Sequence, residues 1–241
     1  MSMRWGIKVD ARGSRLEAGG PLIALLQLCD SLFPIGSFAH SDGLEAATAN
    51  GEVASAEDLS HWMEAGLDQS FGCCDGPALL LAWTSFRQGD WARIREVDDE
   101  VHALRPSSSV RAAGRNMGAR LLKTWTHIRP GGRISEFEAT NSGAFTLPVA
   151  FGIVCAAEDI DAAAALNAYA YTRLAAACSA AMRLMPIGQH EAHRLLAVTL
   201  QRVPALVDAI IARGGGPSVF APALDIAAMA HQYVPSRLFR S

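Results

Sequence analysis

The spacing of apolar residues constrains this fold more than any other sequence feature. After Gly51, apolar residues recur at intervals of three and four through nearly all of the chain, as on the buried face of a helix. No stretch shows the sustained polar–apolar alternation and turn residues that are typical of strands. Because the predicted helices have bundle-like lengths and short connections, we predict an all-α bundle of roughly ten helices in a single domain.

Capping residues and helix breakers suggest where the helices begin and end. Ser55 to Asp58 resembles a capping box that opens a helix ending near Phe71, and Gly76-Pro77 begins the next helix. Ser135 to Glu138 is predicted to be a second capping box. The remaining predicted helices cover residues 90–104, 110–128, 148–158, 161–185, 189–200, 204–213 and 222–233.

Residues 26–45 contain a break between two apolar helical segments. Pro34 lacks a backbone donor and Gly36 permits backbone angles closed to other residues, so together they fix a corner. Ser37 is predicted to cap the segment that resumes, and Asn50-Gly51 to end it. On physical grounds alone, the pattern favours a buried structural corner over a ligand site.

Composition bounds the class of protein. The chain has 241 residues, half of them hydrophobic, and a net charge of -3, so it can bury one substantial core and has no basic face for nucleic acid. Its five cysteines are interpreted as reduced, mostly buried thiols. Residues 1–20 lack the apolar core of a signal peptide, and the most apolar run, residues 144–157, is too short to span a bilayer. We therefore expect a soluble, cytoplasmic protein with no membrane association.

The sequence contains no recognisable catalytic motif. It has neither a phosphate-binding loop nor a nucleophile elbow. His190 and His193 share one helical face and could chelate a metal, but two exposed surface histidines are the favoured interpretation. The acidic run Asp98 to Glu100 is expected on a solvated helix face. We accordingly predict no catalytic residue, no metal ligand and no cofactor.

Four stretches, in order from residue 25 to 241, together resemble one known family. The corner matches its P-x-G-x-F-x-x-S-x-G-L-E signature, and the other stretches are Arg115 to Leu122, Arg183 to Gln189 and the ending R-L-F-R-S. The corner residues that match are Pro34, Gly36, Phe38, Ser41, Gly43, Leu44 and Glu45. In this respect the chain resembles the urease accessory protein UreF family.

The chain departs from that pattern at several positions. His40 and Asp42 stand where the family often has Tyr and Gln, and Gln232 and Pro235 replace a frequent Glu and aromatic residue. His193 falls where Gln is frequent. These differences bear on partner contacts rather than on the fold.

The resemblance implies a non-catalytic factor for urease maturation. Its partners would be UreD (also called UreH), the GTPase UreG and apo-urease, and it would form a homodimer. Nickel and GTP would be handled by the partners, and the factor would bridge them and gate the GTPase. The missing phosphate loop fits this division of labour. The alternatives left open are a stand-alone nickel-binding chaperone and a small-molecule enzyme in an α-bundle.

Two candidate partner-binding regions follow from the same motifs. In the tail, residues 236–241, Arg237, Leu238, Phe239 and Arg240 are expected to engage UreD, with Phe239 as the anchor. The alternative is that Leu238 and Phe239 fold back onto the chain's own core. The second region is the corner, with Pro34, Gly36, Phe38, Ser41, Gly43 and Glu45, which is expected to contribute to the GTPase-facing surface. The chain would thus comprise an arm (1–20), a helical domain (21–235) and the tail.

Overall fold

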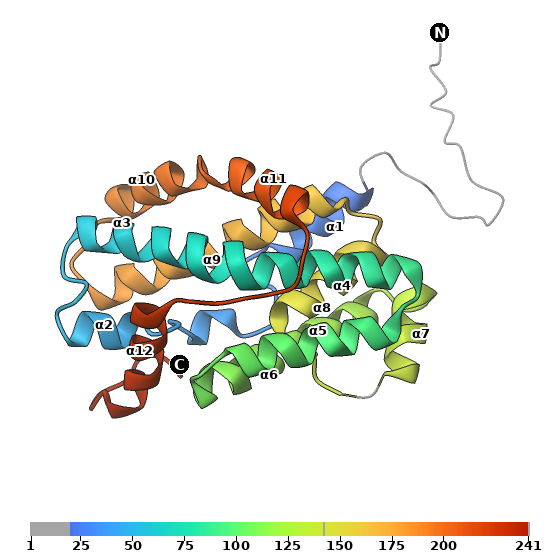
Figure 1. The fold of residues 1–241 in the computed structure, drawn as a ribbon. Helices are drawn as coiled ribbons and strands as arrows, with labels where there is room; N and C mark the ends of the chain where they lie inside the picture. The colour runs from blue at the N-terminus through green and yellow to red at the C-terminus, as the bar shows by residue number, and fades with distance from the viewer. Residues whose placement is uncertain (1–19, 142, 241) are drawn as a thin grey trace, which may run out of the picture.

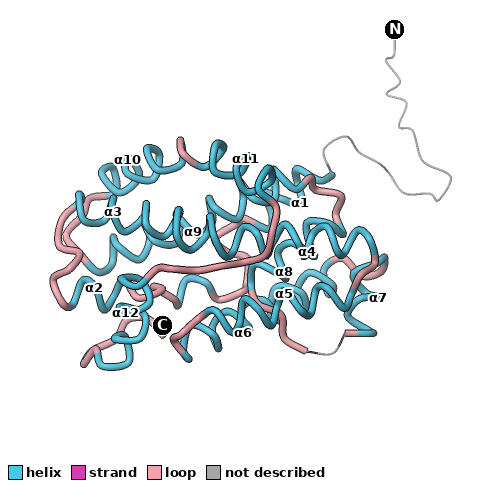
Figure 2. The backbone as a smooth tube through the Cα atoms, in the orientation of Figure 1, coloured by secondary structure: helices cyan, strands magenta, loops and turns pink. Residues whose placement is uncertain are grey.

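The computed structural model describes residues 20–141 and 143–240, and these residues form helices and loops without a strand (Figures 1 and 2). The predicted all-α bundle is confirmed. The predicted N-terminal arm lies, except for Gly20, outside the described residues.

The α-helices are α1 (Gly20–Leu28), α2 (Leu44–Ala49), α3 (Ala56–Ala65), α4 (Gly76–Gln88), α5 (Trp91–Leu104), α6 (Ser108–Ile128), α7 (Gly132–Thr140), α8 (Leu147–Ala157), α9 (Ala162–Leu184), α10 (Gln189–Leu200), α11 (Val203–Arg213) and α12 (Pro222–Ala230). Two short 3₁₀ helices, η1 (Ser37–Ala39) and η3 (His231–Tyr233), and one π-helical segment, η2 (Gly66–Asp75), complete the structure.

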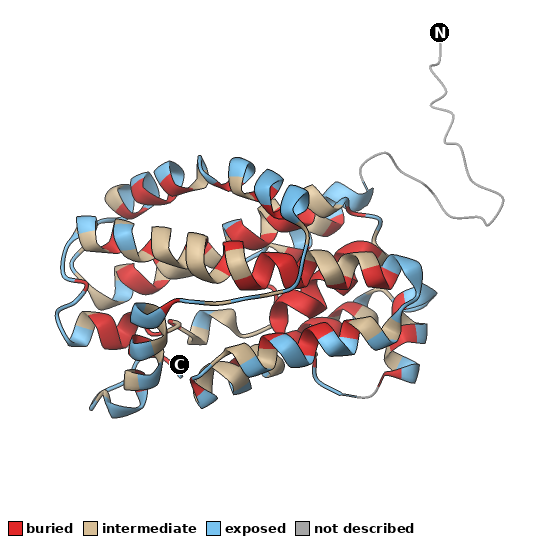
Figure 3. Ribbon diagram, viewed as in Figure 1, coloured by how far each residue is buried: buried red, intermediate tan, exposed pale blue. Residues whose placement is uncertain are grey.

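Helix α8 lies at the centre of the core. All of its residues except Ala157 are buried, and it packs most extensively against α4 and α6 (Figure 3). Two glycines permit this close packing. A Cβ at Gly152 would lie 2.5 Å from the carbonyl oxygen of Leu79, and one at Gly118 only 2.0 Å from that of Phe145. The helices thus approach each other through their backbones.

The segment from residue 56 to 88 differs from the prediction of two separate helices. The capping box is confirmed: the Asp58 amide donates to Ser55 Oγ (3.1 Å) and the Ser55 amide to Asp58 Oδ2 (2.9 Å). The helix does not stop near residue 71, however, but continues as η2 into α4. Pro77 is tolerated because its missing donor falls at the first positions of α4, where the hydrogen-bonding pattern changes.

The predicted capping box at Ser135 is wrong. Helix α7 already begins at Gly132, so Ser135 lies within its first turns. Its hydroxyl accepts the Gly131 amide at 3.0 Å, just before the helix. A serine that can bond backward in this way produces the same local sequence pattern as an N-cap.

The stretch Gln189–Arg213 has the length and mean hydropathy of a membrane-spanning helix, as the core helices of globular bundles also can. Here it divides into α10 and α11. At the junction Arg202 pairs with Asp68 of η2 at 2.8 Å.

The C-terminal part of the chain crosses one face of the bundle. After α11, residues 214–221 run in extended form to α12 (Figure 1), and the Ser218 amide donates to the Cys73 carbonyl at 2.9 Å. We call residues 214–221 the strap. It delivers α12 and the tail to the end of the molecule where α2 and α6 also lie.

Candidate functional site

The corner between α1 and α2 is built from residues in left-handed backbone conformations. Gly36 has φ +83°, Asp42 +51° and Gly43 +91°. A Cβ at Gly43 would lie 2.7 Å from the Ala228 amide nitrogen, so only glycine lets α12 pack directly on the corner. The predicted N-cap role of Ser37 is wrong, because Gly36 and Gly43, which have no side chains, occupy the cap positions of η1 and α2.

Glu45 joins this corner to the tail. Its carboxylate is 3% exposed. One oxygen accepts the Leu238 amide, and the other accepts the Phe239 amide (3.2 Å) and contacts His231 Nε2 (2.7 Å). Hydrogen bonds to an ionised acceptor are stronger than neutral ones. One buried carboxylate therefore fixes three groups of the C-terminal segment.

Arg183 of α9 adds a second connection between corner and tail. Its guanidinium lies 4.4 Å from the ring centre of Phe38 and 4.3 Å from that of Phe239. It also donates to the Phe38 carbonyl at 3.3 Å, and the Arg240 amide donates to the Ala39 carbonyl at 2.8 Å. A cation placed between two aromatic faces stabilises both contacts.

The structure therefore places the two predicted partner-binding regions side by side. Of their residues, Ser41, Gly43, Glu45 and Phe239 are buried, and Gly36 is half-buried. The exposed ones are Pro34, Phe38, Arg237, Leu238 and Arg240. Phe239, at 5% exposure, packs on its own chain, whereas Leu238 is 61% exposed. The closed tail corresponds to the fold-back alternative for Phe239 and leaves Leu238 facing outward. We call the corner and the tail together the closed corner.

Two of the residues that depart from the family pattern lie at the inner side of the closed corner. Asp42 forms an ion pair with Arg173 of α9. Burial, followed by the charges of Arg173, Arg240 and Arg120, lowers the pKa of His40. Its lowered pKa disfavours a further positive charge among these arginines.

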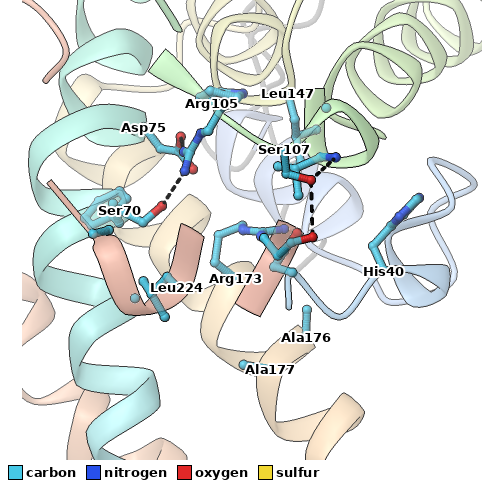
Figure 4. Close-up of a pocket in the computed structure, with 18 of the residues that line it drawn as sticks. His40, Ser70, Asp75, Arg105, Ser107, Leu147, Arg173, Ala176, Ala177 and Leu224 are labelled. Atoms are coloured by element: carbon cyan, nitrogen blue, oxygen red, sulfur yellow. Dashed lines mark hydrogen bonds and ion pairs between the residues drawn. The ribbon is translucent and has the colours of Figure 1, made fainter. Parts of the chain in front are cut away.

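Behind the closed corner lies a cavity of about 160 Å³, which we call the inner cavity (Figure 4). On one wall, Asp75 forms an ion pair with Arg105 and accepts the Tyr169 hydroxyl at 3.1 Å. Arg105 also donates to Ser70 Oγ at 3.1 Å. Burial, and then the negative charge of Asp75, raises the pKa of Tyr169, so the phenol remains a donor.

Sequence reasoning missed this polar group. Its members come from η2, the α5–α6 connection and α9, so no local motif joins them. The available signal was weak: Asp75 is a carboxylate within an otherwise apolar segment, just before Gly76-Pro77.

A second cavity of about 350 Å³ lies between α9 and the corner. Phe38 and Phe239 line it, and it shares His40, Tyr169 and Arg173 with the inner cavity. The Asp42–Arg173 ion pair therefore stands where the two cavities meet.

Among the described residues, no group of three or more His, Cys, Asp and Glu side chains could hold a metal ion. His190 and His193 lie in the first turns of α10, where Glu191 is paired with Arg194 at 2.6 Å. The expectation that Asp98 is a solvated surface acid is wrong. Asp98 is buried, accepts the Thr146 amide at 2.6 Å and pairs with Arg115 at 3.3 Å.

Fold and site together define an all-helical protein whose most distinctive surface is a corner closed by its own C-terminal segment. The UreF family profile matches residues 53–199. The urease accessory protein UreF of Rhodopseudomonas palustris (strain BisA53) is 34% identical over 91% of this chain and 93% of the relative. The UreF proteins of Azoarcus sp. (strain BH72) and Methylibium petroleiphilum are 34% and 31% identical, over 93% and 91% of this chain and 98% and 94% of their own lengths. The chain belongs to the urease accessory protein UreF family.

Proposed function

We propose that this protein is a non-catalytic scaffold of urease maturation that bridges UreD/UreH and the GTPase UreG on apo-urease. In this role it would act in the cytoplasm as a homodimer, with nickel and GTP bound by its partners, and it would gate the GTPase. Membership of a family of urease accessory proteins supports the general role. The closed corner is the observation that supports the bridging role, because it gathers the two motif-bearing regions into one surface.

The exposed part of the closed corner has the composition of an interaction surface. Leu238 and Phe38 are large apolar side chains in solvent, 61% and 63% exposed, and Arg237 and Arg240 flank Leu238. Arginine is enriched among the residues that dominate binding energy, and such residues cluster in well-packed, desolvated contacts. We infer that Leu238 makes the outward contact, while Phe239 positions the tail or is released to anchor in the partner.

The test is complex formation measured by size-exclusion chromatography with light scattering. The full chain, mixed with UreD and UreG of its own organism, is expected to form a ternary complex that deletion of residues 232–241 abolishes. Leu238→Ala should weaken the complex, while Phe220→Ala, an exposed aromatic on the strap, serves as the matched control. Failure of the full chain to form a complex with folded partners would refute the scaffold role.

The two functions of Phe239 can be separated in the same experiment. If Phe239 only positions the tail, Phe239→Leu should keep most of the partner affinity, because leucine still fills the buried site. If Phe239 anchors in UreD, Phe239→Leu should lose affinity although the free chain remains folded. Unchanged UreD affinity in a folded Phe239→Ala variant would exclude both roles.

A further inference from the structure

Helix α12 forms one wall of the inner cavity. Leu224, Asp225 and Ala228 line the cavity from this helix, with Leu224 in view in Figure 4. Ser107 Oγ donates to the Ala228 carbonyl at 3.2 Å, which ties α12 to the start of α6. Whatever occupies the cavity therefore contacts the helix that leads into the tail.

The charges that line the inner cavity fall into two classes. Two ion pairs, Asp75–Arg105 and Asp42–Arg173, are internally balanced. Arg111 and Asp225 belong to neither pair, although the charge of Arg105 also acts on Asp225. Arg111 donates only to the carbonyls of Arg105 (2.6 Å) and Pro106 (2.8 Å), with no carboxylate partner in the described part of the chain.

Asp225 is the complementary case. Its carboxylate has neither a hydrogen bond nor an ion pair with any residue that the structure describes. Burial raises its pKa, and the nearby positive charge of Arg105 opposes this shift only in part. The buried His102 Nδ1 is another lining atom without a partner. Groups of this kind are satisfied by water or by a ligand.

The remaining wall of the cavity is apolar, and part of it belongs to a segment with uncommon π-helical backbone geometry. Leu67, Phe71 and Leu174 face the cavity, and the first two belong to the π-helical η2. π-Helical segments occur frequently at functional sites. A volume of about 160 Å³ corresponds to about ten water-sized spaces, comparable to a ligand with about ten heavy atoms.

We propose that the inner cavity binds a small aliphatic zwitterion of amino-acid size, with its ammonium group at Asp225 and its carboxylate at Arg111. A monocation would leave Arg111 without a counter-charge, and a monoanion would leave Asp225 without one. A zwitterion pairs both and keeps the lining electrically balanced, which a partly desolvated site requires. Its aliphatic part lies against Leu67, Leu174 and Leu224.

Bound ligand would hold α12 in place and thereby order the tail. This consequence rests on the proposed function, since it concerns the partner-binding surface, but ligand binding itself does not. The coupling runs through His231, which directly follows α12 and contacts Glu45. The ligand is therefore expected to slow hydrogen exchange of the Leu238 and Phe239 amides.

The test is isothermal titration calorimetry on the full chain alone, with L-leucine as the probe. Two analogues separate the charges: 3-methylbutylamine lacks the carboxylate and 4-methylpentanoate lacks the ammonium group. L-leucine is expected to bind saturably at millimolar concentrations or below, and each analogue at least about tenfold more weakly. The absence of saturable leucine binding, or equal binding of either analogue, would overturn the proposal.

Variants locate the site. Asp225→Asn and Arg111→Gln should each weaken leucine binding by at least about tenfold. Asp208→Asn, an exposed acid on α11, should leave it unchanged. The Asp225 side chain has no hydrogen bond or ion pair within the described chain, so its variant should fold normally, as circular dichroism can verify. Wild-type affinity in Asp225→Asn would refute the site while leaving the scaffold role untouched, because no partner protein is present.

Discussion

At the scale of single residues, Gly43 is the corner position that tolerates substitution least. It combines a φ of +91° with direct contact to the α12 backbone. Gly43→Ala therefore adds both backbone strain and a collision with the Ala228 amide. We expect it to lower the free energy of unfolding by about 2 kcal/mol or more, measured by urea denaturation.

Gly51 provides the matched control for that substitution. Its φ is +78°, but a Cβ there would meet nothing within 4 Å. Gly51→Ala should therefore cost only the backbone strain, about 1 kcal/mol. Equal losses in the two variants would mean that α12 does not pack on the corner in solution.

Glu45 is the second residue whose role is specific enough to test. An amide at this position would turn one acceptor into a donor that faces the Phe239 amide or the Leu238 amide. We expect Glu45→Gln to lower the free energy of unfolding by about 1–3 kcal/mol and to speed hydrogen exchange of those two amides. In Glu52→Gln, which changes an exposed acid, exchange should match the wild type. Unchanged tail exchange in Glu45→Gln would show that the carboxylate does not hold the tail.

The buried thiols give a further prediction at the scale of residues. Burial raises the pKa of Cys29 and Cys178 to about 11 and that of Cys74 to about 12. It also raises the pKa of Cys155 well above its usual value. At pH 8 these four thiols are almost wholly protonated and therefore unreactive. Iodoacetamide should label Cys73 first, as mass spectrometry of digests would show. Earlier labelling of Cys74 or Cys155 would contradict the packing of η2 or α8.

At the scale of elements, the strap is a largely exposed segment that leads to the site. Phe220 is 84% exposed in an extended segment, unlike the aromatic residues of the core. Limited digestion with chymotrypsin should therefore cut first after Phe220, and Phe220→Ala should remove that cut. A first cut inside α4 or α8 would be incompatible with the bundle.

Most elements could be predicted from sequence because apolar spacing and caps are local signals. α10 was predicted at its observed bounds, and Asp161 caps α9 by accepting the Ala164 amide at 2.8 Å. Two of the failures occurred where the backbone departs from regular α-helical geometry. A π-helical segment keeps the chain helical through Gly76-Pro77, and a left-handed turn replaced the expected cap at Ser37.

At the scale of the whole molecule, the positions of the motifs could be predicted from the sequence, but the contacts between distant motifs could not. The family signature singled out Glu45 and Phe239, yet nothing local indicates that a carboxylate near the start of the chain accepts amides near its end. The same holds for Asp75 with Tyr169, and for Asp225 and Arg111, which line one cavity from α12 and α6. Contacts of this kind depend on how the helices pack, which a single sequence does not report.

The Glu45 contacts join residues nearly the whole chain apart, since His231, Leu238 and Phe239 all meet one carboxylate on α2. Because closing so long a loop is entropically costly, we expect these contacts to form after the intervening helices have packed. The closed corner can therefore exist only on a correctly finished bundle. A binding partner that recognises the closed corner would therefore bind only completely folded copies. Unfinished or misfolded copies would not enter the complex, because they lack this surface.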